Sequence, residues 1–402
     1  MKDFVTSSTL WPEVSQFLSD SWVHKFGSMS QEFRFDQRIP ESLMSMVLDS
    51  PYPGMAVPDS FCGGGANLAE CCRVQMILGF YNPGLAIGLN MHLFTLGVMT
   101  EHWKREKDIS WMLLEGIAKK NSLVASAFAE PGLSGHILRS NTKARKVTGG
   151  YLLNGIKVPC SLASRSELLC LQAEVQGSDG PELIVGLLPT GTKGVRIRQT
   201  NAMWGMPHAE SDEITLTDCL LPDALVFHKT IPGVDHQHVF SASMVWFCLT
   251  ASAVYLGLMN RAFTESIDLL RGTSSGPGAS MKCESGSVQT QWGRLWAKYS
   301  TQEQAAACLS RLASETRSGA ETLLSESLAL KCSVSDQCSE IVSSLAELVG
   351  GKSYVKDQIF TDLLRDSQAV KYHPPVTSQC QKIISQRELG KQSGFSMELG
   401  TS

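Results

Sequence analysis

The chain has 402 residues, of which 43% are hydrophobic and 18% are charged, and its formal net charge is −4. This composition favours an ordered globular protein and excludes a disordered chain. The nearly balanced charge, without a block of Lys or Arg, indicates neither nucleic-acid binding nor attachment to a membrane surface.

The first residues and the cysteines predict a cytoplasmic protein. Polar residues follow residues 1–5, where a secretory signal would have an apolar core. The longest apolar run, residues 85–99, is interrupted by Asn90 and His92 and is too short to span a bilayer, so we expect a buried helix there. The twelve cysteines include no Cys-x-x-Cys pair, which favours reduced, buried thiols over a zinc site or a disulfide framework.

Residues 1–123 are predicted to form an N-terminal helical domain. Apolar residues recur at helical spacing in residues 40–48 and 67–78. Gly63-Gly64-Gly65 is not followed by Lys and Ser or Thr, and no strand and helix flank it, so we interpret it as a turn and not as a phosphate loop.

Residues 124–235 are predicted to form a middle β domain. Gly149-Gly150 has the sequence of a hairpin turn. The expected strands are residues 122–127, 151–153, 167–175, 182–188, 194–198 and 213–220. Six or more strands without an intervening helix indicate a compact antiparallel domain.

Residues 236–402 are predicted to form a C-terminal helical bundle. The expected helices are residues 239–270, 302–317, 325–333 and 335–348. Residues 272–286, which are rich in Gly, Ser and Pro, are expected to be a loop. The order along the chain is therefore helices, strands and helices again.

Five motifs between about residues 40 and 389 resemble those of the acyl-CoA dehydrogenase superfamily, in the same order. They are Val57-Pro58-Asp59 with Gly63-Gly64-Gly65, Ala129-Glu130-Pro131-Gly132-Leu133-Ser134-Gly135, residues 150–157, Gly205-Met206 with residues 213–222, and Gly350-Gly351 with Leu364-Arg365-Asp366. The resemblance implies an α+β fold with an N-terminal helical domain, a middle antiparallel β domain and a C-terminal four-helix bundle. It also implies a homodimer or a homotetramer, because the family completes its cofactor site across subunits.

The same resemblance implies a flavin, FAD or alternatively FMN, between the β domain and the bundle. Backbone groups of Phe128 and Ala129 would face the isoalloxazine edge, and Cys160-Ser161 would lie beside the ring, with Ser161 where the family has a Thr near N5. Ser134 or Gly135 would touch the phosphate. Gly350-Gly351 would allow a pyrophosphate from a neighbouring subunit to approach closely. Arg271 is what remains of the Arg-x-Gln-Phe-Gly segment that holds the adenylate half of FAD.

The departures from the family's pattern concern the catalytic base first of all. Neither position where the family has its Glu, in residues 371–376 or near residues 245–248, holds a carboxylate. His373 takes the first place and could transfer a proton at neutral pH, although a structural His beside the Pro-Pro turn is an equal alternative. Ala129 replaces a Thr, and Glu347 replaces a Gln.

The remaining histidines give no metal site. His136 follows the flavin-loop motif and is expected to be a solvated loop residue. His236 and His238 are two residues apart, so one helical face cannot present both of them as metal ligands. We therefore predict no metal.

Three functions follow as hypotheses from the resemblance. The first is a flavin-dependent oxidoreductase of specialised metabolism that oxidises an acyl thioester on CoA or on a carrier protein, with His373 as the base. The second is a two-component monooxygenase that receives reduced flavin from a reductase, because Cys160-Ser161, residues 347–351 and Arg365-Asp366 followed by His373 resemble that branch of the fold. The third is a protein without net redox chemistry, either a thioester cyclase or isomerase or a structural partner.

Overall fold

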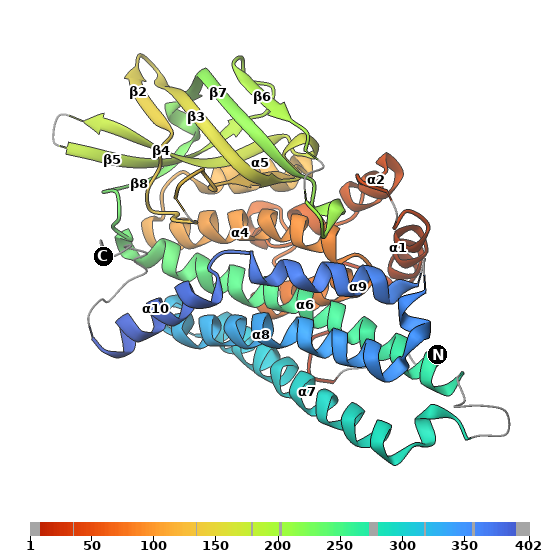
Figure 1. The fold of residues 1–402 in the computed structure, drawn as a ribbon. Helices are drawn as coiled ribbons and strands as arrows, with labels where there is room; N and C mark the ends of the chain where they lie inside the picture. The colour runs from red at the N-terminus through yellow and green to blue at the C-terminus, as the bar shows by residue number, and fades with distance from the viewer. Residues whose placement is uncertain are drawn as a thin grey trace.

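A β-sheet lies across one side of a body of long helices in the computed structural model of the chain (Figure 1). The structure describes residues 9–34, 36–133, 135–177, 180–200, 203–272, 280–316, 319–355 and 358–390. Helices precede and follow the strands along the chain, as the sequence predicts. The α+β fold class is thereby confirmed, while the boundaries at residues 123 and 235 stay predictions.

The helices before the sheet include the two that the sequence predicts. They are α1 (Asp20–Glu32), α2 (Glu41–Leu48), α3 (Leu68–Tyr81), α4 (Pro83–Glu106) and α5 (Trp111–Lys120). Asn67 and Glu70 form a capping box at the start of α3. Pro83 is the first residue of α4, where its missing N–H costs no hydrogen bond, and the side chain of Asn82 caps the helix. The apolar run at residues 85–99 is buried in α4, as expected.

The sheet has the order β6-β7-β3-β2-β4-β5-β8, with β1 also paired to β4. Its strands are β1 (Val124–Ala127), β2 (Lys143–Val147), β3 (Gly150–Ser161), β4 (Leu168–Gly177), β5 (Gly180–Pro189), β6 (Val195–Arg198), β7 (Ser211–Pro222) and β8 (Val226–Thr230). Gly149 has a φ of 81° in the hairpin between β2 and β3, which explains the glycine at that turn.

The prediction of an antiparallel sheet needs a correction at β4. Both β1 and β2 run parallel to β4, whereas the other pairs are antiparallel. Val124 pairs with Leu168 and Lys143 pairs with Glu174, so β1 and β2 lie one after the other along the same edge of β4. The chain leaves the sheet between them, at residues 128–142, and returns in the same direction. The excursion carries the predicted flavin loop.

The first helix after the sheet agrees with the prediction, the next two are longer than predicted, and the last two are not among the expected helices. These elements follow the sheet in chain order. They are α6 (Val239–Arg271), α7 (Gly286–Glu315), α8 (Leu324–Val349), α9 (Ile359–Ser367) and α10 (Thr377–Glu388). The two predicted segments at residues 325–348 are one helix, because Leu330, Val334 and Cys338 continue one buried face across Ser333 and Ser335. Helix α7 begins 16 residues before the predicted start at residue 302, where Trp292 and Trp296 pack on Phe263 of α6.

Helix α6 lies at the centre of the helical body. It is long and apolar enough to cross a membrane, but its most apolar window is entirely buried inside the protein, as in the central helix of a bundle. One hydrophobic core cluster combines residues of the helices that precede the strands in the chain with residues of the helices that follow them. A second cluster consists mainly of residues of the strands. Helices α4 and α6 both contribute residues to a pocket beside the sheet.

Candidate active site

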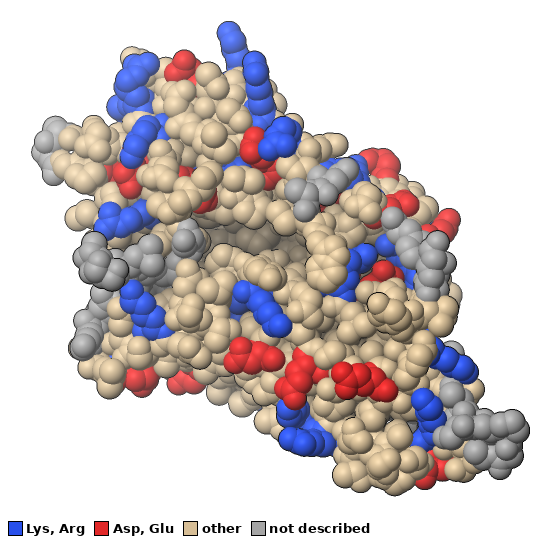
Figure 2. Space-filling model, viewed as in Figure 1, with Lys and Arg blue, Asp and Glu red and all other residues tan. Residues whose placement is uncertain are grey.

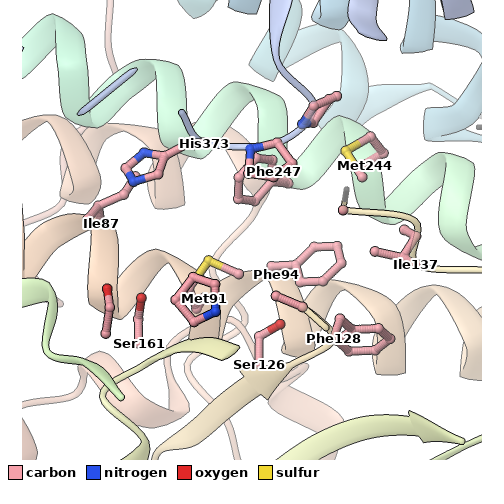
Figure 3. Close-up of a pocket in the computed structure, with 16 residues that line it drawn as sticks. Ile87, Met91, Phe94, Ser126, Phe128, Ile137, Ser161, Met244, Phe247 and His373 are labelled. Carbon is pink, nitrogen blue, oxygen red and sulfur yellow. The ribbon is translucent and has the colours of Figure 1, made fainter. Parts of the chain in front are cut away.

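An uncharged pocket opens between the sheet and the helices. Figure 2 shows the hollow, and Figure 3 shows His373 and Phe247 on one side of it and Ser126 and Ser161 on the other. The lining residues that the structure describes are Ile87, Met91, Phe94, Ser126, Phe128, Ala129, Gly135, Ile137, Pro159, Ser161, Ser211, Met244, Phe247, His373, Pro374 and Pro375. None of these is Asp, Glu, Lys or Arg, so the imidazole of His373 is the ionisable side chain among the described lining residues.

Glu130 fixes the loop of residues 128–142 against the sheet. Its carboxylate accepts hydrogen bonds from the hydroxyl groups of Ser140 (2.5 Å) and Thr142 (3.1 Å) and from backbone N–H groups of the same loop. It also forms an ion pair with Lys157 of β3, and both side chains are fully buried. Burial raises the pKa of Glu130, but the charge of Lys157 and these hydrogen bonds lower it by more. The net effect is a lowered pKa, so Glu130 stays ionised.

Gln172 of β4 completes the attachment of this loop. Its amide Nε2 donates to the backbone oxygen of Phe128 (2.9 Å), and its own backbone oxygen accepts a hydrogen bond from Lys157 Nζ (2.7 Å). Gln172 lies on β4 between the stretches that pair with β1 and β2. Gln172 therefore holds Phe128, and with it Ala129, at the place on β4 where the pairing with β1 ends and before the pairing with β2 begins. Glu130 and Lys157 stand within two of the motifs, but the sequence pattern indicates no role for either residue.

Small polar residues form the sheet side of the pocket. Ser161 at the end of β3 pairs with Ser211 at the start of β7, and both line the pocket. Ser126 of β1 is 4% exposed, and its hydroxyl has no hydrogen-bond partner among the described residues. A buried hydroxyl without a hydrogen-bond partner destabilises the folded protein, so Ser126 is suited to form a hydrogen bond with a polar atom of a bound molecule.

Four of the predicted cofactor residues line this pocket: Phe128, Ala129, Gly135 and Ser161. Ser134 lies outside the described residues. The thiol of Cys160 is buried in the core of the sheet and donates to the backbone oxygen of Ser126 (3.3 Å), so it points away from the pocket. For Cys160, therefore, only the backbone remains available for the predicted contact.

The other three predicted cofactor residues, Arg271, Gly350 and Gly351, lie at the far end of the helical body. About 36 Å of helix separate Arg271 from Phe247, which lines the pocket on the same helix. Arg271 and Trp292 line a separate pocket. Lys352 donates to the backbone oxygen of Gly272 (3.4 Å), which brings the end of α6 close to Gly350-Gly351. A single chain thus does not bring the two predicted groups together.

His373 reaches the pocket from the segment between α9 and α10. Its Nδ1 is 2.7 Å from the hydroxyl oxygen of Tyr255 on α6. The ammonium group of Lys331 on α8 donates to the backbone oxygens of His373 (2.9 Å) and Pro375 (2.8 Å). Burial, and then the charge of Lys331, lower the pKa of His373 to about 4, so the imidazole is neutral at neutral pH.

Sequence analysis missed both neighbours of His373. Tyr255 stands in the middle of an apolar helix and Lys331 in the middle of α8, with no motif around either of them. They meet His373 only because three segments far apart in sequence pack together. No local signal could have shown this contact.

The histidines other than His373 were not predicted to bind a metal. Among the residues that the structure describes, no cluster of three or more His, Cys, Asp or Glu side chains could hold a metal ion. His136 is half-buried next to the flavin-loop motif, and burial followed by the charge of Arg139 lowers its pKa.

Comparisons with known proteins agree with this geometry. Residues 238–373 match the family model of the acyl-CoA dehydrogenase C-terminal domain. The chain is 27% identical to isobutylamine N-hydroxylase of Streptomyces viridifaciens, over 80% of this chain and 82% of that protein. It is 22% identical to the mitochondrial isovaleryl-CoA dehydrogenase of Arabidopsis thaliana, over 94% of this chain and 90% of that one.

Two solved structures have the same fold over nearly the whole chain. One is KijD3 in complex with FMN and a dTDP-linked amino sugar, with a TM-score of 0.81, 21% identity, and 93% of this chain and 92% of that chain covered. The other is butyryl-CoA dehydrogenase of Megasphaera elsdenii, with a TM-score of 0.81, 15% identity, and 92% and 96% covered. The predicted fold is therefore confirmed over both the helices and the sheet.

Proposed function

We propose that the chain is a flavin-dependent oxidoreductase of the acyl-CoA dehydrogenase superfamily, and within it a monooxygenase that hydroxylates the nitrogen of a small apolar amine. The observation that carries the proposal is the absence of a carboxylate among the described residues that line the pocket. A dehydrogenase needs a base within hydrogen-bond reach of the α-proton. Oxygen transfer to an amine uses the nitrogen lone pair and needs no such base.

The residues on the sheet side of the pocket fit a flavin ring. Phe128, Ala129 and Ser161 line the pocket, and the small side chains of Ala129 and Ser161 leave room for a ring to approach the backbone. The partnerless hydroxyl of Ser126 would hydrogen-bond to a heteroatom of the bound ring or of a substrate beside it. When bound and reduced, the flavin activates dioxygen and supplies one oxygen atom to the substrate, while the second leaves as water.

The amine class of substrate is supported by the walls of the pocket. Phe94, Phe247 and Met244 offer an apolar surface to a hydrocarbon body, and no described lining residue carries a negative charge that would pair with an ammonium ion. Such a pocket favours the neutral amine, which is the form with a free lone pair. The name of the similar isobutylamine N-hydroxylase agrees with this class.

The partners and the compartment follow as part of the same proposal. A monooxygenase of this type receives its reduced flavin from a separate reductase, which is the partner we propose, and works in the cytoplasm. The cofactor is FAD or FMN, in a homodimer or homotetramer. Arg271 and Gly350-Gly351 of one chain would then serve the cofactor of a second copy, because they lie too far from the pocket of their own chain.

Oxidation of an acyl thioester is the second candidate. It is favoured by the likeness to isovaleryl-CoA dehydrogenase over 94% of this chain. His373 would have to act as the base in that reaction. A small molecule or a carrier protein would then present the acyl group.

One experiment separates the candidates. The purified protein is loaded with FAD or FMN, and its absorbance is recorded anaerobically with a panel of acyl-CoA and acyl-carrier thioesters. The chemically reduced protein is then mixed with oxygen and a panel of primary amines, and hydroxylamines are measured by mass spectrometry. Hydroxylamine formation without bleaching by any thioester supports the proposal, whereas bleaching by a thioester and no hydroxylamine overturns it. A protein that takes up neither flavin would support the third hypothesis, a non-redox member of the fold.

A further inference from the structure

The hydrogen bonds around His373 decide which of its two ring nitrogens carries the proton. Tyr255 is 2% exposed, and burial raises the pKa of its hydroxyl well above 10, so it keeps its proton. Besides His373 Nδ1 at 2.7 Å, its described hydrogen-bond partner is the sulfur of Met206 at 3.8 Å. A thioether sulfur is a weak acceptor, so the phenol gains most by donating to Nδ1.

The same hydrogen bonds disfavour the other tautomer of His373, in which Nδ1 carries the proton. If Nδ1 carried the proton and donated to the phenol oxygen, the hydroxyl proton of Tyr255 would be left with the sulfur of Met206. A buried donor with so weak an acceptor costs about 1–3 kcal/mol. The neutral imidazole therefore has its lone pair on Nδ1 and its proton on Nε2, which has no hydrogen-bond partner among the described residues.

Lys331 contributes a positive charge and a fixed backbone. Its side chain is 3% exposed, and no carboxylate of the described residues lies within ion-pair distance of its ammonium group. Its hydrogen bonds to the backbone oxygens of His373 and Pro375 hold the segment that carries the imidazole. A neighbouring cation opposes a second proton on the ring.

The other ionisable groups around this segment do not offset that charge. They are the thiols of Cys248 on α6, of Cys332 and Cys338 on α8 and of Cys380 on α10, together with Asp336 beside Cys332 on α8, Lys371 on the same segment as His373, and Asp366, which faces Tyr255 from α9. Asp366 is itself paired with Arg365. Asp336 accepts a hydrogen bond from Thr377 (3.2 Å). Lys331 is the charge that acts directly on His373.

We propose that Tyr255 and Lys331 are positioning residues that make His373 a neutral hydrogen-bond donor, with its Nε2–H free for a molecule in the pocket. His373 is then not a base in its resting state, since the lone pair that a base needs is already bonded to Tyr255. A donor at this place can stabilise an oxygen atom that gains negative charge, as oxygen transfer to an amine requires, whereas it cannot accept an α-proton. The role of His373 in oxygen transfer rests on the proposed function, whereas the assignment of its tautomer does not depend on that function.

Nitrogen NMR of protein labelled with ¹⁵N at histidine tests the tautomer without flavin or turnover. His373 is identified by comparison with His373→Gln. We expect an Nε2 signal of the protonated type coupled to hydrogen and an Nδ1 signal of the unprotonated type at pH 7. In Tyr255→Phe the preference for this tautomer should be lost, while Tyr299→Phe, which removes another buried phenol, should leave the His373 signals unchanged.

A titration of the same signals tests Lys331. Lys331→Met keeps the length of the side chain and removes the charge, and it should raise the pKa of His373 by about 1 or more. Lys298→Met, at an ion pair on the surface of the bundle, is the control. A proton on Nδ1 in the wild type, or a Tyr255→Phe spectrum identical to the wild type, would overturn the assignment. An unchanged titration in Lys331→Met would remove Lys331 from it. If the tautomer holds and no hydroxylamine forms, the proposed function fails while this inference stands.

Discussion

His373 is the residue on which the proposed chemistry depends. A positioned proton donor or acceptor contributes about 10²–10⁴-fold to a rate, so His373→Ala should lower turnover by that factor. Flavin affinity should change little, because Phe128 and Ser161, two of the predicted flavin contacts, lie on the other side of the pocket (Figure 3). Stopped-flow rates and flavin titration measure the two effects. Unchanged turnover, or loss of the flavin, would reject the catalytic role.

His92 predicts how stability depends on pH. It is 2% exposed, its Nε2 bonds to the backbone oxygen of Pro53 (2.8 Å), and its Nδ1 accepts from the backbone N–H of Val124 (3.0 Å). Burial lowers the pKa of His92 to about 4, compared with about 6.5 in an unfolded chain.

Between pH 4 and pH 6.5, His92 therefore binds more protons in the unfolded protein than in the folded protein. The free energy of unfolding falls as the pH drops from about 6.5 towards 4. The stabilisation is complete above pH 6.5. Thermal unfolding at pH 7, 6 and 5 should show a decreasing Tm. The decrease should be smaller in His92→Gln, and an equal decrease in both proteins would contradict this account.

Ser126 and Ser140 form a matched pair of buried hydroxyls. The hydroxyl of Ser126 has no partner in the described structure, whereas that of Ser140 donates to Glu130. Ser126→Ala should therefore leave the stability of the flavin-free protein unchanged or raise it slightly, and Ser140→Ala should lower it by about 1–3 kcal/mol. Chemical denaturation measures both. Flavin or substrate affinity should decrease in Ser126→Ala, and equal stability losses in the two variants would contradict the assignment.

At the scale of elements, the loop between β1 and β2 is the feature that makes the pocket. Glu130 and Lys157 hold it by a buried ion pair, and removal of one partner leaves the other charge buried without compensation. Glu130→Gln should therefore destabilise the protein by about 3–5 kcal/mol and weaken flavin binding. Denaturation and fluorescence titration of the flavin measure these changes.

The control for the loop is an ion pair on the surface of the same sheet. Lys143 pairs with Glu174, and its side chain is 62% exposed, so Lys143→Met should change stability by less than about 1 kcal/mol. If Glu130→Gln were as mild as this control, the buried pair would not be what holds the loop.

At the scale of the whole molecule, the two groups of predicted cofactor residues lie at opposite ends of α6. If a second copy joins them, Arg271→Ala should weaken the binding of FAD, while the binding of FMN should not change, because FMN has no adenylate half to contact Arg271. Calorimetric titration with each flavin measures this, alongside sedimentation for the oligomeric state. Equal affinities of the wild type and the variant for both flavins would remove Arg271 from the cofactor site.

The local pattern of the sequence was enough for the elements and for their order. The Gly149-Gly150 hairpin, the apolar run of α6 and the positions of the expected strands depend on residues close together in the chain, and they are found. However, β3 runs to Ser161, well beyond the expected end at residue 153, and β8 is not among the expected strands. The motif resemblance was enough for the fold, which the comparisons confirm, and for four residues that line the pocket. Where the sequence failed was at α7 and α8, whose lengths depend on packing against α6 and on a buried face that continues across two serines.

The sequence by itself determined that the chain has this α+β fold and that no Glu stands where the family has its base. Only the tertiary structure decided the parallel pairing of β1 and β2 with β4, the role of Glu130 and Lys157, and the surroundings of His373. The physical reason is that periodicity reports which residues face a core, whereas the partner of a buried polar group is chosen by segments that meet in space. Tyr255 and Lys331 are 118 and 42 residues from His373 in sequence, and only packing brings them within hydrogen-bond distance.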